Sequence, residues 1–142
     1  MRQVNFAFIG SGKTLRDCID EVKQFSRSSD EYLINIKYVF IDPSKGFFDN
    51  RLPEQLISEG IPATMVAELN SETNIQIIKK LKVDYLISVN NHQILKKDII
   101  LAPAKAVLNF HNGPLPKYGG LNACTWAIYN WPAPQKLIHL LC

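Results

Sequence analysis

Short apolar runs alternate with amphipathic stretches along most of the chain. Residues 4–9 form an apolar run that ends at Gly10-Ser11-Gly12, a pattern typical of a buried strand that enters a turn. Apolar residues then recur at spacings of three and four, with charged residues between them, which predicts an amphipathic helix. The apolar face of this helix consists of Leu15, Cys18, Ile19, Val22 and Phe25.

The same reasoning predicts four further strands and three further helices. The strands are expected at residues 34–41, 61–66, 83–89 and 106–110. The helices are expected from Pro53 to Gly60, from Ser71 to Lys82 and over residues 122–130. Pro62 weakens the third strand and places it near an edge of the sheet. Strands that alternate with helices predict an α/β fold with a largely parallel sheet.

Composition and charge exclude several classes of protein. The chain has 142 residues, of which 46% are hydrophobic and 20% are charged, as expected of one globular domain. Its net charge of +3 does not indicate a nucleic-acid partner, and no apolar run approaches the ~18 residues of a membrane span. Three cysteines without ligand spacing indicate a reducing compartment and no metal site. Because the N-terminus lacks the pattern of a signal peptide, we expect a cytoplasmic protein.

The turn Gly10-Ser11-Gly12 resembles two nucleotide-binding motifs without completing either. A phosphate-binding loop needs a Gly five residues before its second Gly, where this chain has Ala7 inside the strand. A dinucleotide fingerprint needs Gly or Ala where this chain has Leu15. Asp42, at the end of the second strand, could meet a ribose hydroxyl, but it also suits an ordinary turn. An ATPase is therefore disfavoured, and a nicotinamide-dependent oxidoreductase stays open as an alternative.

Residues 109–120 carry the most informative chemistry. They begin in the last predicted strand, and open α/β sheets bind their ligands at the carboxyl ends of such strands. Because successive residues alternate faces, Asn109 and His111 should project together while Phe110 points into the core. An amide donor and a titratable imidazole would then lie side by side, followed by a loop rich in Pro and Gly. This pairing predicts a functional site.

Asn109-x-His111, followed by Leu115-Pro116 and a nearby Gly, resembles the motif of the 10-formyltetrahydrofolate-dependent formyltransferases. That family includes glycinamide ribonucleotide formyltransferase, methionyl-tRNA formyltransferase and the amino-sugar N-formyltransferases. The resemblance extends upstream to residues 84–89 and 93–95 and to the first strand, and downstream to about Tyr129. It implies a Rossmann-like, open, largely parallel sheet with helices on both faces, whose C-terminal strands are missing from this chain.

The resemblance also implies a reaction and a set of site residues. A formyl group would pass from 10-formyltetrahydrofolate to a primary amine, and no metal takes part. Asn109 would stabilise the oxyanion, while His111 would stabilise charge and carry a proton. Backbone groups around Gln93, Ile94 and Leu95 would hold the pterin ring. The expected partners are therefore a folate and an amine substrate, with no nucleic acid and no membrane.

Two short segments narrow the acceptor that the resemblance implies. Residues 111–116 and 120–123 are most similar to the formylation domains that open some nonribosomal peptide synthetases. This similarity favours an aminoacyl group on a carrier protein as the acceptor. The amino group of a nucleotide sugar is the other candidate.

Members of the family also use an Asp, well downstream of the catalytic His, to orient the imidazole. This sequence has no Asp or Glu after Asp98, and residues 131–142 depart from the family pattern. The resemblance therefore predicts a formyltransferase N-terminal domain at residues 1–130 and a divergent tail at residues 131–142, in an incomplete and poorly active form. A non-catalytic folate- or nucleotide-binding domain is the remaining alternative.

Overall fold

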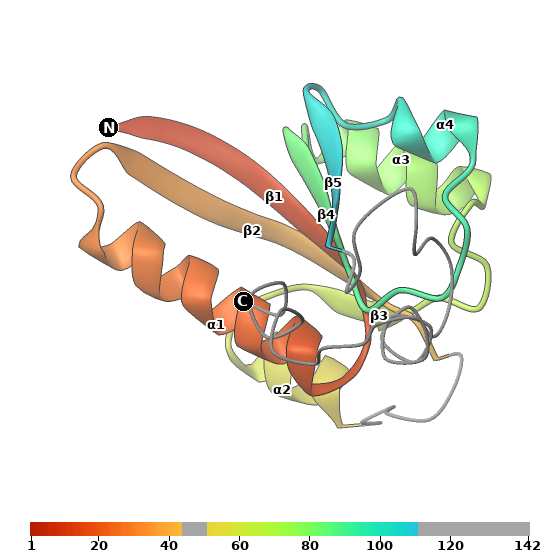
Figure 1. The fold of residues 1–142 in the computed structure, drawn as a ribbon, viewed down its shortest axis with the longest axis horizontal. Helices are drawn as coiled ribbons and strands as arrows, with labels where there is room; N and C mark the ends of the chain where they lie inside the picture. The colour runs from red at the N-terminus through yellow and green to blue at the C-terminus, as the bar shows by residue number, and fades with distance from the viewer. Residues whose placement is uncertain (44–50, 111–142) are drawn as a thin grey trace, which may run out of the picture. The chain divides into compact units, whose positions relative to one another are not determined.

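A five-stranded sheet runs through the protein in the order β3-β2-β1-β4-β5 (Figure 1). The structure, a computed structural model, describes residues 1–43 and 51–110, and Met1–Asn109 form one compact unit. The β1–β2, β1–β4 and β2–β3 pairs are parallel, which confirms the predicted α/β fold. The strands are β1 (Arg2–Gly10), β2 (Tyr32–Ile41), β3 (Ala63–Met65), β4 (Tyr85–Val89) and β5 (Ala106–Phe110). Pro62 directly precedes the edge strand β3, as predicted.

Helices cover both faces of the sheet, as expected. In the described part of the chain, α1 (Gly12–Ser28) and α2 (Leu52–Ser58) lie on one face, and α3 (Glu72–Lys80) and α4 (Lys97–Ile100) lie on the other (Figure 1). Ser71 caps α3, because its side chain accepts a hydrogen bond from the backbone N–H of Asn74. Pro53 lies in the first turn of α2, where a missing N–H removes no helical hydrogen bond.

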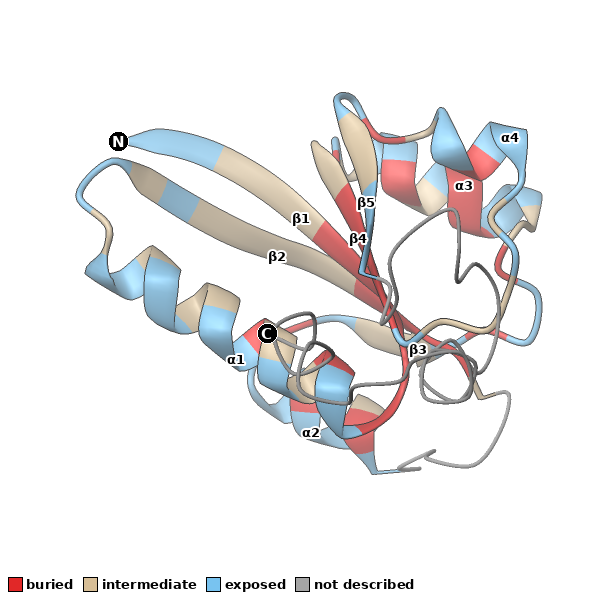
Figure 2. Ribbon diagram, in the orientation of Figure 1, coloured by how far each residue is buried: buried red, intermediate tan, exposed pale blue. Residues whose placement is uncertain are grey.

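Side chains alternate between the two faces along the central strands, so the sheet has a buried core on either side. Figure 2 shows that the buried residues of these strands lie toward the ends nearest β3. The core beneath α3 and α4 contains Ala7, Ile9, Phe40, Val66, Leu69, Ile75, Ile78, Val83, Leu86 and Ile99. The core beneath α1 and α2 contains Phe8, Leu15, Ile19, Val39, Ile41, Leu52, Leu56, Ile61, Ile87 and Val89. Apolar side chains thus fill the space between the central strands and the helices on both faces of the sheet.

Ile61 and Val83 are buried, but they lie outside the strands in which their apolar pattern placed them. The N–H of Ile61 donates to the carbonyl of Leu56 in α2, and the N–H of Val83 donates to the carbonyl of Ile78 in α3. Each residue therefore closes a helix before the next strand begins, and β3 and β4 start later than predicted. The predicted helix at residues 122–130 and the tail at residues 131–142 lie outside the described residues.

An ion-pair network joins α1 to the end of α2. Arg16 Nη1 lies 2.7 Å from Glu59 Oε1, and Lys23 Nζ lies 2.7 Å from Glu59 Oε2. Arg16 also pairs with Asp20, with 2.8 Å between Nη2 and Oδ1. The hydrogen bond from Arg16, and to a smaller extent the one from Lys23, lowers the pKa of Glu59 from 4.5 to about 2. The hydrogen bond that Arg16 donates to Glu59, and to a smaller extent the one to Asp20, raises the pKa of Arg16.

Replacing Glu59 with Gln should lower the free energy of unfolding by about 1 kcal/mol at pH 7, since the pair is partly screened by solvent. A carboxylate whose folded-state pKa is lowered stabilises the fold above its ordinary pKa, and this contribution is lost as pH falls toward the folded-state pKa. The difference between the two proteins should therefore be constant above about pH 4.5 and shrink toward pH 2. Urea unfolding of the parent and of Glu59→Gln across this pH range measures the difference in their free energies of unfolding. Glu21→Gln, at an exposed position of α1, is the control. A difference that does not depend on pH would contradict the ion-pair explanation.

Candidate functional site

The carboxyl ends of the parallel strands meet at one edge of the sheet, and polar residues follow β1, β2 and β4. Gly10 ends β1 and Asp42 follows β2. The β4 loop, which we define as residues 90–96, follows β4 and leads into α4. Asn109 lies near the end of β5. The described residues that the sequence singled out therefore lie at or after the ends of neighbouring strands.

The turn after β1 packs directly against the start of the β4 loop. The hydroxyl of Ser11 donates to the carbonyl of Asn90 over 3.0 Å, and Asn90 Nδ2 donates to the carbonyl of Ser11 over 3.2 Å. Asn90 adopts a positive φ of 49°, which Asn tolerates better than most residues do. A Cβ atom at Gly10 would overlap the carbonyl oxygen of Val89. Because Ser11 is 1% exposed, this turn is closed by protein contacts and offers no open cradle for phosphates.

Asp42 anchors the middle of the β4 loop. Its Oδ2 accepts from the backbone N–H of His92 over 2.9 Å, and its Oδ1 accepts from Gln93 Nε2 over 3.1 Å. The residue is 0% exposed, so its carboxylate is turned inward to the loop. A buried carboxylate cannot meet a ribose hydroxyl from solvent, which removes the main support for a nicotinamide site.

Gln93 connects the β4 loop to the loop after β3. Its Oε1 accepts from the backbone N–H of Leu69 over 2.7 Å, and its Nε2 also donates to the carbonyl of Val66 over 3.0 Å. The backbone of Gln93 is held as well, because Asn91 Oδ1 accepts from its N–H and Asn91 Nδ2 donates to its carbonyl. The side chain of Gln93 is therefore hydrogen-bonded inside the protein, and the predicted contact of this segment with a cofactor stays a prediction.

Asn70 anchors the far end of the β4 loop. Its Nδ2 donates to the carbonyl of Ile94 over 2.8 Å, and its Oδ1 accepts from the N–H of Lys96 over 2.7 Å. Ile94 is 84% exposed, whereas Leu95 packs against the core beneath α3 and α4. Among the described residues, the N–H groups of Ile94 and Leu95 have no hydrogen-bond acceptor. Two N–H groups without a protein acceptor in the described part of the chain thus lie in a loop that is held on both sides.

His92 was not singled out from the sequence, although it occupies the same kind of position as His111. Its ring Nδ1 is buried and has no hydrogen-bond partner in the described part of the chain, and it lies 3.7 Å from Asp42 Oδ2. Ser88, which is 1% exposed, also has a buried hydroxyl without a partner among these residues. Buried polar atoms of this kind are uncommon and are typical of binding sites or of positions filled by water. The rule that directed attention to strand ends could have found His92.

The predicted pairing of Asn109 with His111 can be followed only in part. Asn109 lies in β5 and is exposed. Phe110 is 62% exposed, so the expectation that it points into the core is wrong. The last three residues of β5 are all exposed, so the alternation of faces seen along the central strands does not reach this end of the edge strand. His111 lies outside the described residues, and its place beside Asn109 stays a prediction.

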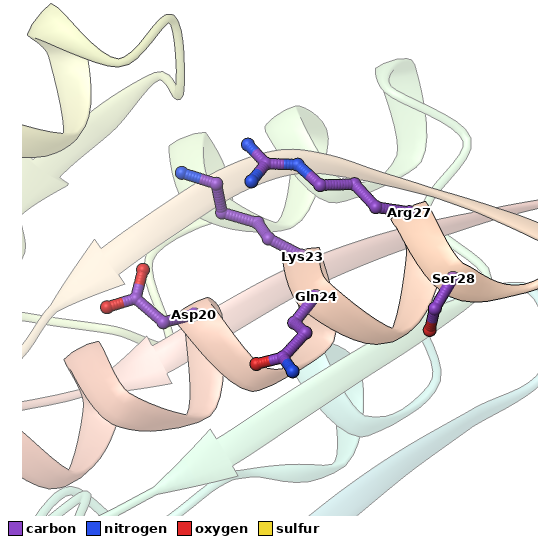
Figure 3. Close-up of a pocket in the computed structure, with 5 residues that line it drawn as sticks. All are labelled: Asp20, Lys23, Gln24, Arg27 and Ser28. Atoms are coloured by element: carbon purple, nitrogen blue, oxygen red, sulfur yellow. The ribbon is translucent and has the colours of Figure 1, made fainter.

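A shallow hollow lies on the outer surface of α1, away from the strand ends. Its lining residues come from the second half of that helix and are polar (Figure 3): Asp20, Lys23, Gln24, Arg27 and Ser28. Lys23 is already paired with Glu59, and Asp20 with Arg16. Of the residues predicted to bind or to react, none that the structure describes lines this hollow.

The described residues contain neither a metal centre nor a transmembrane helix. Within residues 1–43 and 51–110, no three His, Cys, Asp or Glu side chains are grouped closely enough to hold a metal ion. In the same ranges, no helix is long and apolar enough to cross a membrane.

Residues 3–131 match the family model described as formyl transferase. The chain is 32% identical over 117 residues to a methionyl-tRNA formyltransferase of Clostridium tetani, a match that covers 75% of this chain and 38% of that protein. It is 29% identical over 87 residues to the bifunctional polymyxin resistance protein ArnA of Wigglesworthia glossinidia brevipalpis, covering 61% and 13% of the two chains. The chain thus spans well under half the length of these relatives.

Solved structures show the same fold at low sequence identity. The phosphoribosylglycinamide formyltransferase of Campylobacter jejuni subsp. jejuni superposes with a TM-score of 0.70 at 14% identity, covering 93% of this chain and 70% of that one. The glycinamide ribonucleotide transformylase 1 of Symbiobacterium toebii gives a TM-score of 0.67 at 18% identity, covering 89% and 60%. The predicted Rossmann-like α/β architecture is confirmed by these likenesses.

Replacing Gly10 with Ala should destabilise the protein by more than about 3 kcal/mol, because the new methyl group would force β1 away from the Val89 carbonyl. Gly60→Ala is the matched control. Gly60 has a φ of +79° and open space around it, so its substitution should cost only the backbone term of about 1 kcal/mol. Thermal or denaturant unfolding measures both. Equal losses in the two variants would show that the close approach of β1 to β4 is not what requires a Gly.

Proposed function

Because the chain belongs to the formyl transferase family, we propose that it transfers a formyl group from 10-formyltetrahydrofolate to a primary amine. The observation that carries this proposal is the extent of the family match. It runs through the β4 loop and through the segment that begins at Asn109. The contacts of the β4 loop support the binding step, and the Asn109–His111 pair supports the chemical step.

The β4 loop provides the folate site of the proposal. The side chain of Gln93 is bonded inside the protein, so the pterin ring would be held by the peptide groups of Ile94 and Leu95. Their N–H groups can donate to the ring's nitrogen and oxygen acceptors. Because the loop is held at His92, Gln93 and Lys96, these donors lose little conformational entropy when a ligand binds.

Asn109 and His111 would carry the chemistry. The amine attacks the formyl carbon, a tetrahedral intermediate with an oxyanion forms, and the folate nitrogen leaves with the electron pair of the broken C–N bond. Donors aimed at that oxygen stabilise it by roughly 2.7–4 kcal/mol each. His111 would also take the proton that the attacking amine loses, since imidazole titrates near neutral pH.

The acceptor is the least constrained part of the proposal. The relatives named above act, by their names, on methionyl-tRNA or take part in polymyxin resistance, so the amine differs within the family. The sequence at residues 111–116 and 120–123 supports an aminoacyl group on a carrier protein, and the amino group of a nucleotide sugar is the second candidate. We further propose, from the same resemblance, that residues 1–130 act as the formyltransferase domain.

A second function is folate binding without efficient transfer. No Asp or Glu occurs among residues 99–142, so no carboxylate in that segment can orient His111. Loss of the residue that orients a catalytic His costs about four orders of magnitude in serine proteases. Binding with little turnover would therefore favour this second function.

The binding step predicts that the chain binds 5-formyltetrahydrofolate, a stable analogue of the donor. We expect a dissociation constant on the order of 1 mM, which corresponds to about 4 kcal/mol and suits a site built from a few backbone donors. Isothermal titration calorimetry measures the affinity, and NAD serves as the control ligand. An absence of heat with the folate would contradict the proposal, and binding of NAD instead would revive the oxidoreductase alternative.

The chemical step predicts that His111→Ala and Asn109→Ala each lower turnover by two or more orders of magnitude, because each removes a group that stabilises the oxyanion. Glu21→Gln, at an exposed position of α1 that is present in both proteins, is the control and should leave turnover unchanged. Formylation is measured with a panel of primary amines, in this chain and in a hybrid whose segment after Tyr129 comes from a relative. If both alanine variants retained the activity of the parent, the active site would have to lie elsewhere.

A further inference from the structure

We propose that Asp42 is a positioning residue for the cofactor and that it sets folate affinity by fixing the conformation of the β4 loop. This inference rests on the proposed function, because it assigns the loop to the folate. Asp42 lies after β2, far along the chain from the loop that it holds. It would act through its neighbours and without touching the ligand.

The position of the Asp42 carboxylate is itself fixed by the sheet. The backbone N–H of Asp42 donates to the carbonyl of Gly10 over 2.8 Å, so the residue continues the pairing between β1 and β2. Its side chain is 0% exposed. The carboxylate therefore projects from the rigid part of the fold and cannot follow a moving loop.

Each oxygen of this carboxylate holds a different residue of the β4 loop. Oδ2 accepts from the main chain at His92 over 2.9 Å, and Oδ1 accepts from the side chain of Gln93 over 3.1 Å. Hydrogen bonds to an ionised acceptor are roughly twice as strong as those between neutral groups. Two adjacent residues are thus bound to one charged group.

Gln93 extends the anchor from one strand end to the next. The second N–H of its amide donates to the carbonyl of Val66, and its oxygen accepts from the N–H of Leu69. Both donor positions of this amide are therefore occupied, together with one lone pair of its oxygen. We call these bonds of Asp42 and Gln93 the Asp42–Gln93 clamp. It ties the ends of β2 and β3 to the β4 loop.

The two N–H groups proposed to meet the folate directly follow the clamp. Ile94 and Leu95 come immediately after Gln93, and Asn70 holds the chain again at the carbonyl of Ile94 and the N–H of Lys96. A shift of the peptide at Gln93 must therefore alter the direction of the next two N–H groups. Hydrogen-bond donation depends steeply on that direction, so a loosened clamp should weaken binding.

The experiment replaces Asp42 with Asn, which keeps the size and shape of the side chain. One acceptor then becomes an N–H₂ group that faces a donor, either the His92 N–H or the Gln93 amide. We expect the dissociation constant for 5-formyltetrahydrofolate to rise about tenfold or more, on the usual cost of a lost charged hydrogen bond. Calorimetry measures this affinity. Asp98→Asn, an exposed carboxylate on α4, is the matched control and should bind as the parent does.

A second readout follows the loop itself and needs no ligand. Amide hydrogen exchange at His92 and Leu69 should become faster in Asp42→Asn, whereas exchange at Phe8 in the middle of the sheet should not change. Gln93→Met, of similar length, serves as a second variant should Asp42→Asn fail to fold. The protein with both Asp42→Asn and Gln93→Met should lose less binding free energy than the sum of the losses in the two single variants. The reason is that both substitutions remove the same hydrogen bond, from Gln93 Nε2 to Asp42 Oδ1.

The outcomes separate this inference from the function on which it rests. If the parent chain binds no folate, the proposed function fails and this inference fails with it. If the parent binds, and exchange is faster in the variants while the affinity is unchanged, Asp42 has only a structural role. If exchange at His92 is unchanged, Asp42 does not hold the loop. Weaker binding with faster exchange at these two amides, and at no amide of the central sheet, supports the inference.

Discussion

The close approach of β1 to β4 at Gly10 is the contact from which the rest of the site is built. With no side chain at Gly10, the turn after β1 can lie against the Val89 carbonyl. The Gly10 carbonyl also accepts from the N–H of Asp42, so the ends of β1 and β2 are held in register. Asp42 in turn holds the β4 loop at His92 and Gln93. The contact between Gly10 and Val89 is thus linked, through the hydrogen bonds of Asp42, to the β4 loop and to the candidate ligand site.

This series explains why the candidate folate site consists mainly of backbone groups. Side chains at the edge of the sheet, such as those of Asp42, Gln93 and Asn70, are used to hold one loop against another. The peptide groups between the held points are the ones that we propose for the ligand. A site of this kind depends on loop geometry more than on the identity of Ile94, whose side chain points to solvent.

The sequence predicts those features that depend on local pattern and misses those that depend on distant partners. All five strands were found, because the apolar residues of a buried parallel strand form a continuous run. The starts of β3 and β4 were misplaced, because Ile61 and Val83 are buried in turns and a hydrophobicity pattern reports burial but not strand pairing. Gln93 was selected through the family resemblance, whereas its bonds to Asp42 could not be foreseen from residues 51 positions away. Phe110 was expected to be buried by alternation, but the exposed end of β5 departs from that rule.

The burial of Asp42 is consistent with the positioning role that we propose for this residue. Removing a carboxylate from water costs several kcal/mol, and even well-paired buried charges are often replaced by apolar residues without loss of stability. The two cores on either side of the sheet show that apolar packing is available to this fold. An apolar residue at position 42 could fill the space, but it could not direct the His92 N–H and the Gln93 amide at once. A buried charge that is bonded to two consecutive residues of one loop specifies a single loop conformation, which is what a preformed ligand site requires.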